Sequence, residues 1–137
     1  MLANLSVLEA KRYGVYQCEQ DQTLYEAARL MVDEDVSALV VTDEEGCLMG
    51  ILSRTDLMRA LLTDQEWENR PVRLYMVGEV VTAGPHATLL EVAKLLLEHQ
   101  IHRVVVVKDE EGKKRPLSVI SAADIVYHPH REDPRCK

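Results

Sequence analysis

The chain has 137 residues, the size of one domain or of two half-domains that share a core. Hydrophobic residues make up 47% of it and charged residues 28%, a globular balance, and Phe is absent, so we expect a core of aliphatic side chains. The net charge of −7 argues against a nucleic-acid binder, no apolar run could span a bilayer, and no signal peptide is evident, so we expect a cytoplasmic protein.

The first half of the chain predicts the order strand, helix, strand, strand, helix after a short lead-in. Thr23 and Glu26 have the capping-box spacing, and apolar residues follow them at helical intervals. Polar residues dominate 63–71, which we interpret as a linker. The predicted strands are 15–18, 36–42 and 47–52. One predicted helix begins at residue 24 and is ended by the acidic residues 33–35, and the other begins after Asp56 and ends at about residue 62.

The second half repeats this order. Thr88 lies 65 positions after Thr23, and Asp124 lies 68 positions after Asp56, so three residues are inserted near 113–116. The predicted elements are strands over 80–82, 101–107 and 117–120, a helix opened by Thr88 and Glu91, and a last helix over 124–127.

These two halves predict an α+β fold of two β-α-β-β-α repeats, over 1–70 and 71–137. A lone repeat of about sixty residues would be marginally stable, because a small domain buries too little of its surface. We therefore expect the two repeats to pack sheet-to-sheet with pseudo-two-fold symmetry.

The motifs resemble those of a tandem pair of CBS domains, the modules named after cystathionine β-synthase. The resemblance runs from about residue 12 to 128. The segments that carry it are 36–41 with 50–56 in the first repeat, and 102–107 with 121–124 in the second.

Two interpretations remain open for Ser53-x-x-Asp56 and Ser121-x-x-Asp124, which stand where a strand meets a helix. The spacing is itself a capping box, which would be a structural role. The family resemblance implies instead that each acid accepts hydrogen bonds from the ribose hydroxyls of an adenine nucleotide, which suits a carboxylate with two acceptor oxygens.

The resemblance also implies the remaining members of two ligand pockets. His102 and Arg103 would meet phosphates, although a structural corner near Glu98 is the alternative. The matching positions of the first repeat are uncharged. One pocket would combine residues of the first motif with the second-repeat pair: Ile51, Ser53, Thr55 and Asp56 with His102 and Arg103. The other pocket would combine residues of the second motif with their first-repeat counterparts: Val119, Ser121 and Asp124 with Ser37 and Ala38. Val81, and also Tyr16, would flank an adenine.

Departures from the family pattern affect the second pocket. Ser118 stands where a Gly is expected, and Ala123 lacks the hydroxyl that Thr55 has. The basic segment 113–115 predicts a solvated hairpin tip, or alternatively a phosphate or partner contact. His128, His130 and Cys136 offer only three soft ligands, so we predict no metal site.

No catalytic motif is present, so we expect no enzyme activity and no required cofactor. The resemblance implies a regulatory module that senses AMP, ADP, ATP or S-adenosylmethionine in the cleft between the repeats, forms a homodimer and acts on an unknown downstream effector protein. Membrane partners are not expected. The alternatives are a ligand-free dimerisation or interaction module and a nucleic-acid-binding regulator.

Overall fold

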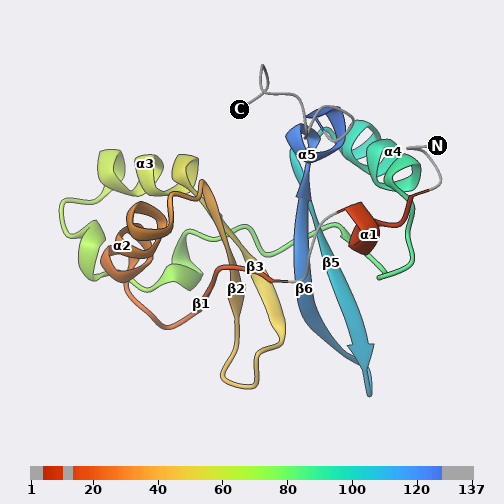
Figure 1. Cartoon of the computed structure of the whole chain (residues 1–137). Coiled ribbons are helices and arrows are strands. Elements are labelled where there is room, and N and C mark those ends of the chain that lie inside the picture. Colours follow the sequence, from red (N-terminus) through yellow and green to blue (C-terminus); the bar gives the residue numbers. More distant parts are fainter. Residues whose placement is uncertain (1–4, 11–13, 128–137) are drawn as a thin grey trace. The chain divides into compact units, whose positions relative to one another are not determined.

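The structure is a computed structural model that describes residues 5–10 and 14–127 (Figure 1). The chain divides into two compact units, each with a three-stranded sheet. The first-repeat unit comprises Val15–Val80 and Glu110–Arg115. The second-repeat unit comprises Val81–Asp109 and the described residues of Met1–Gly14 and Pro116–Lys137. The predicted α+β class with two three-stranded sheets is confirmed.

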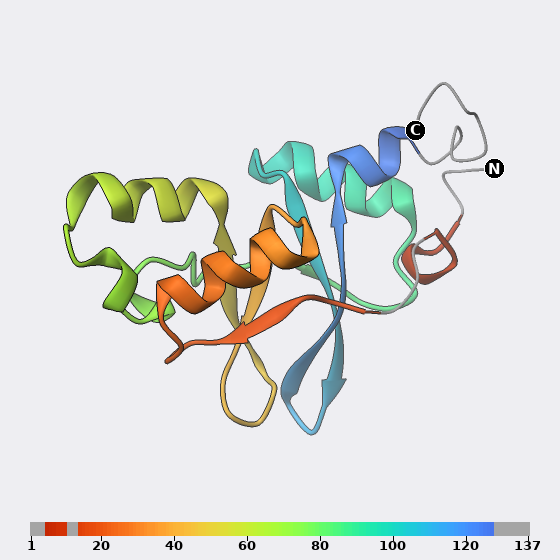
Figure 2. The same cartoon turned by 60° about the vertical axis from the view of Figure 1, so that its left-hand side comes forward.

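The sheet of the first-repeat unit has the order β1-β2-β3. β1 (Gln17–Glu19) pairs parallel with β2 (Ala38–Thr42), and β2 pairs antiparallel with β3 (Leu48–Ser53). The helices α2 (Leu24–Glu34) and α3 (Arg54–Thr63) lie on one side of this sheet (Figures 1 and 2). Its core is aliphatic, as the composition predicts: Leu24, Leu39 and Leu52 are fully buried.

The start of α2 is the predicted capping box. The Thr23 hydroxyl oxygen accepts the Glu26 N–H at 3.1 Å, and the Glu26 carboxylate accepts the Thr23 N–H at 3.2 Å. Because two otherwise unpaired donors are satisfied, the helix has a defined first residue. Leu24, Ala27 and Met31 then face the core at helical spacing.

The predicted linker is packed against the first-repeat unit. Two 3₁₀ helices, η2 (Trp67–Asn69) and η3 (Val72–Leu74), follow α3. Val72 is fully buried, and its N–H donates to the Gln22 carbonyl at 2.8 Å. The sequence repeats divide near residue 70, whereas residues 71–80 pack with the first-repeat unit.

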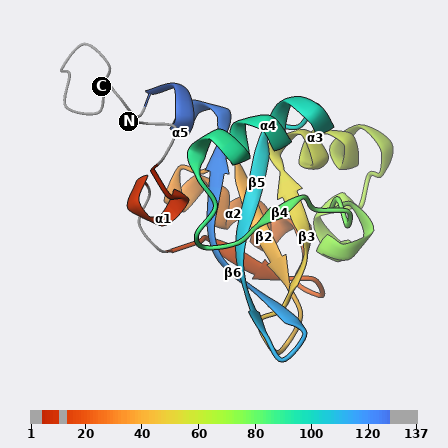
Figure 3. The same cartoon turned by 90° about the vertical axis from the view of Figure 1, so that its right-hand side faces the viewer.

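The second-repeat unit has the sheet order β4-β5-β6, with β4 (Thr82–Ala83) parallel to β5 (Arg103–Glu110) and β6 (Lys113–Ser121) next to β5. Its helices are α1 (Val7–Ala10), α4 (Leu89–His99) and α5 (Ala122–Tyr127). In Figure 3 α4 lies in front of the sheet, and α1 lies to the side of β6. The buried core combines residues of α1, α4 and all three strands: Val7, Ala83, Leu89, Val92, Leu96, Val104, Val106 and Ile120.

Two sequence-based boundaries were wrong in an informative way. β6 begins at Lys113 and β5 continues to Glu110, so the inserted residues lengthen the hairpin and do not form a loop. Glu111 and Gly112 have φ values of 54° and 82°, the left-handed conformation that a two-residue hairpin turn requires.

The second boundary is that of α3, which begins at Arg54, so Asp56 lies within its first turn. His128, Pro129, His130 and Cys136 lie outside the described residues.

Candidate ligand-binding site

The first candidate site is the joint where β3 ends and α3 begins. Ser53 is the N-cap, with an extended backbone (φ −114°, ψ 169°), and its hydroxyl oxygen accepts the Asp56 N–H at 3.4 Å. One carboxylate oxygen of Asp56, Oδ2, accepts the Ser53 N–H at 2.8 Å and the Ser53 hydroxyl at 3.0 Å. The capping-box interpretation is therefore confirmed for this motif.

The second oxygen of Asp56 is also engaged. Arg59, one turn further along α3, donates from Nη1 to Oδ1 at 3.2 Å. The Asp56 side chain is only 4% exposed, whereas that of Arg59 is 69% exposed. A buried carboxylate requires such partners, because an unpaired buried charge is costly.

The second candidate site, at the end of β6, repeats this geometry. Oδ2 of Asp124 accepts the Ser121 N–H at 2.8 Å and the Ser121 hydroxyl at 3.1 Å. The Ser121 hydroxyl oxygen accepts the Asp124 N–H at 3.2 Å. Asp124 is half-buried, in contrast to Asp56. In both repeats the acid thus completes the capping box through Oδ2.

Within each unit, the predicted phosphate or pocket residues lie beside the joint of the same repeat. Ala38 pairs with Ser53 across β2 and β3, and the Ser37 carbonyl accepts the Arg54 N–H at 3.0 Å. The His102 carbonyl likewise accepts the Ala122 N–H at 3.2 Å. The side chain of His102 is exposed and that of Arg103 is half-buried. The expected exchange of these residues between the repeats stays a prediction.

The apolar members of the predicted site occupy strand positions. Ile51 is half-buried, and it exchanges two backbone hydrogen bonds with Val77, at 3.0 and 2.9 Å. Val119 is half-buried on β6, and Val81 packs against the core of the second-repeat unit. Thr55 is exposed in the first turn of α3. Their assignment to a ligand stays a prediction.

The Gly-to-Ser difference between the repeats has a clear physical basis. Gly50 is buried under the segment that follows η3: a Cβ there would lie 2.6 Å from the Val77 carbonyl oxygen and 2.9 Å from Met76 Sδ. Ser118, at the matching position of β6, is 0% exposed. Its hydroxyl is buried without a hydrogen-bond partner. Only the first repeat therefore requires Gly at this position.

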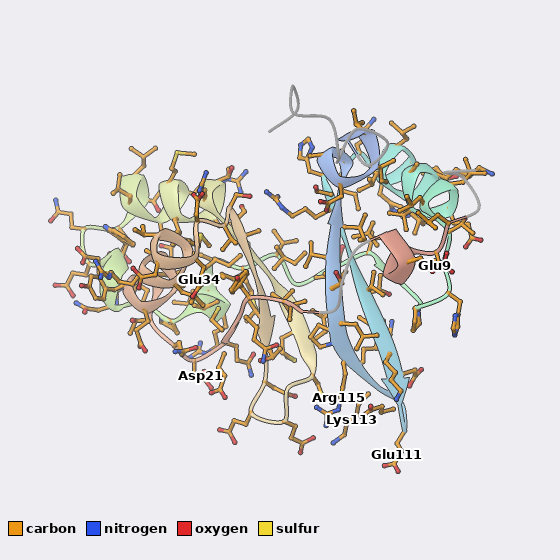
Figure 4. All side chains as sticks on the ribbon, in the orientation of Figure 1. Glu9, Asp21, Glu34, Glu111, Lys113 and Arg115 are labelled. Atoms are coloured by element: carbon orange, nitrogen blue, oxygen red, sulfur yellow. The ribbon has the colours of Figure 1, made fainter. Side chains whose placement is uncertain are left out.

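Two basic residues of 113–115, Lys113 and Arg115, are paired with acids of the first-repeat unit. Lys113 Nζ binds the Glu45 carboxylate, and this bond and its charge raise the pKa of Lys113. Arg115 donates to the Glu110 carboxylate and to the Glu45 carbonyl, both at 2.7 Å. Figure 4 shows Lys113 and Arg115 together near the hairpin end, with Glu111 at its turn. The segment is strand and not loop, but Lys113 and Lys114 are exposed, as the solvated interpretation predicts. Lys113 and Arg115 already have acidic partners.

A hollow of about 540 Å³ lies at the other end of β2, away from Asp56. Residues of β1, of the end of β2 and of the turn that follows it line this hollow, including Glu19, Thr42 and Glu44. The Cys47 N–H donates to the Asp43 carboxylate there and is the main reason that the pKa of Asp43 is lowered. Among the residues that the structure describes, no group of three or more His, Cys, Asp and Glu side chains is arranged to hold a metal ion.

Comparisons with known proteins define the family. The family model of the CBS domain matches residues 11–63 and 72–131. This chain therefore belongs to the CBS domain family and contains two copies of the domain.

In the part of the chain that the structure describes, no helix is both long and apolar enough to cross a membrane.

Individual relatives agree with this assignment. The CBS domain-containing protein YhcV of Bacillus subtilis is 31% identical over 102 residues, which are 74% of this chain and 72% of YhcV. The gamma-3 subunit of 5'-AMP-activated protein kinase from Sus scrofa is 32% identical over 108 residues, 73% of this chain but 20% of that subunit. This chain spans 44%, 58% and 19% of three further curated relatives.

Solved structures show the same fold. The CBS domain pair of protein MJ0100, crystallised in complex with 5'-methylthioadenosine and S-adenosyl-L-methionine, superposes with a TM-score of 0.78 at 23% identity. The match covers 88% of this chain and 92% of that one. The fold predicted from the repeats is therefore that of a CBS pair.

Proposed function

We propose that this chain is a regulatory module that binds an adenine-containing ligand such as AMP, ADP, ATP or S-adenosylmethionine. The carrying observation is the repeated geometry of Asp56 and Asp124. Each carboxylate is fixed in the first turn of a helix by a Ser cap, at matching positions of the two repeats. A fixed carboxylate is a suitable acceptor for the two hydroxyls of a ribose.

The relatives support an adenine compound as the ligand class. The MJ0100 pair is described in complex with two adenosine derivatives, and the gamma-3 subunit belongs to a kinase activated by AMP according to its name. His102 and Arg103 are the residues of this chain that we assign to ligand phosphates, since a guanidinium matches phosphate oxygens and an imidazole adds a donor.

The proposed mechanism is a shift of population. A ligand that binds one arrangement of the protein more tightly than another favours that arrangement by the difference in affinity. We infer that the ligand is sensed and not converted, and that the resulting change is passed to an effector protein.

Thermal unfolding tests this proposal directly. A ligand that binds only the folded state stabilises it by about 2.7 kcal/mol at 100 times its Kd, which raises Tm by several degrees. We expect such a rise with at least one of AMP, ADP, ATP and S-adenosylmethionine. If none of the four changes Tm at millimolar concentration, the proposed ligand class is wrong.

The role of the two acids is tested by Asp56→Asn and Asp124→Asn. Asn keeps an acceptor for the cap but loses the charge, so we expect the Tm rise to fall for at least one variant. Asp33→Asn is the matched control, because Asp33 is exposed on α2 and pairs only loosely with Arg29 at 3.8 Å. Unchanged ligand response in both test variants would contradict the ribose assignment.

A second candidate function, homodimerisation, is favoured by the exposed apolar side chains of α3. Met58, Leu61 and Leu62 are all exposed, Leu62 by 81%. Unpaired apolar side chains that gather on one surface commonly mark interaction sites. We expect a dimer in sedimentation velocity that Leu62→Glu weakens and the nearby control Gln65→Glu does not. A monomeric parent protein would exclude this function.

A further inference from the structure

Asp56 has no oxygen left for a ribose while Arg59 is in place. Oδ2 accepts two bonds from Ser53, and Oδ1 accepts the Arg59 guanidinium at 3.2 Å. The carboxylate is 4% exposed. A ribose hydroxyl can therefore donate to Oδ1 only if the guanidinium moves away.

Arg59 is able to make that movement. Its side chain is 69% exposed, and the bond to Oδ1 is the one that holds its guanidinium to Asp56. Two ribose hydroxyls would give the buried carboxylate new donors, so Asp56 does not lose its partners when the guanidinium leaves. The freed guanidinium is a cation with hydrogen-bond donors only, so it needs a new acceptor.

We propose that Arg59 determines ligand specificity at the first-repeat site, an inference that rests on the proposed function. Arg59 covers Asp56 in the ligand-free protein and transfers to a ligand phosphate when the ribose takes its place. A nucleoside breaks the Arg59–Asp56 pair without replacing it, whereas a nucleotide supplies phosphate oxygens. The site therefore favours a 5'-phosphorylated adenine ribonucleotide over adenosine.

The second repeat has a different residue at this position. Three residues after Asp124 the chain has Tyr127, which has no cationic group. Arg59 thus lets the first-repeat site distinguish a nucleotide from a nucleoside. Tyr127 cannot do this for the Asp124 site.

Arg54 provides a matched control on the same helix. Its side chain is 60% exposed, close to that of Arg59, but its partner is Asp35 at 3.8 Å. Replacing Arg54 by Met removes the same charge from the same helix without touching Asp56.

Calorimetric titration of AMP and adenosine tests the proposal in an Asp124→Asn background, which isolates the first-repeat site. We expect Arg59→Met to tighten adenosine binding by about threefold, since no pair must be broken, and to weaken AMP binding by a similar factor. The preference for AMP then falls by about tenfold. Arg54→Met should leave that preference unchanged, and Arg59→Gln is a second variant should Arg59→Met fold poorly.

The outcomes separate the two proposals. If the parent chain binds neither AMP nor adenosine, the role of Arg59 is overturned, and the proposed function fails as well only if ADP, ATP and S-adenosylmethionine do not bind either. If the parent chain binds but the AMP preference in Arg59→Met equals that of Arg54→Met, the role of Arg59 is overturned and the proposed function stands. Loss of all binding in the Asp124→Asn background also overturns the role of Arg59, because the ligand then depends on the other joint.

Discussion

The two strand-to-helix joints of this chain have the same local geometry in different surroundings. The Ser N–H lies 2.8 Å from the Asp carboxylate in both, and the Ser hydroxyl lies 3.0 Å from it in one and 3.1 Å in the other. These bonds link residues three positions apart, so the local sequence alone determines them.

The surroundings differ because residues outside the motif determine them. Asp56 is buried and pairs with Arg59, and the neighbouring Gly50 is covered by residues 76 and 77. Asp124 is half-buried, and Ser118 replaces the Gly. A duplicated motif can therefore keep its cap while its exposure, and with it any ligand preference, diverges.

The largest expected difference is between Gly50→Ala and Ser118→Ala. A Cβ at residue 50 would lie 2.6 Å from a backbone oxygen, so we expect a loss of about 2–4 kcal/mol in the free energy of unfolding. At residue 118, Ala removes a buried hydroxyl that has no partner, so we expect a gain of about 1 kcal/mol. Urea denaturation measures both. Equal effects at the two positions would contradict the difference in packing.

The next difference concerns the acids themselves. Asp56→Ala removes the carboxylate of the capping box and the partner of Arg59 from a buried position, so we expect a loss of about 2 kcal/mol in unfolding free energy. Asp124→Ala removes the equivalent carboxylate at a half-buried position, and we expect a loss of about 1 kcal/mol. Chemical denaturation measures both, and Asp33→Ala, at an exposed position, should stay within about 0.5 kcal/mol of the parent. A larger loss for Asp124→Ala than for Asp56→Ala would reverse the comparison.

The sequence predicted those features that depend on neighbours along the chain. The caps at Thr23, Ser53 and Ser121 follow from residues three positions apart, and the repeat follows from a constant offset. The same reasoning placed the start of α3 too late, because Arg54 and Thr55 are polar and do not show the apolar spacing of a helix. A Ser that caps a helix requires the helix to begin at the next residue.

Features that depend on distant residues were not predictable in this way. Val72 is buried, and its N–H donates to the carbonyl of Gln22. Lys113 is paired with Glu45, which lies 68 positions earlier in the chain. No local pattern marks either contact. The spacing of Asp56 and Arg59 could have predicted their ion pair, because side chains three apart on a helix are neighbours. The effect of this pair on ligand access depends on the burial of Asp56, which no local pattern shows.

A smaller difference is expected between the caps of α2 and α4. Thr23→Ala and Thr88→Ala each remove a hydroxyl that accepts an N–H, at 3.1 and 3.2 Å, so each should cost about 1 kcal/mol in unfolding free energy. The loss at Thr23 should be the larger, because its hydroxyl also donates to Glu26 at 3.1 Å. Thermal unfolding measures both, and the Ser variants, which keep the hydroxyl, should restore most of the stability. A greater loss at Thr88 would contradict the comparison.

The smallest expected difference at neutral pH concerns Cys18 of β1 and Ala83, its counterpart in β4. Burial raises the pKa of Cys18 from its ordinary value of 9.0 to about 11, so the folded chain keeps this proton at pH values where the unfolded chain loses it. The unfolded state then binds fewer protons, and stability falls as pH rises from about 9 to 11. Cys18→Ala copies the residue of the second repeat and removes this decline. Denaturation at pH 7, 9 and 10.5 should show the parent losing stability relative to the variant only above about pH 9; parallel curves would mean that the thiol ionises equally in both states.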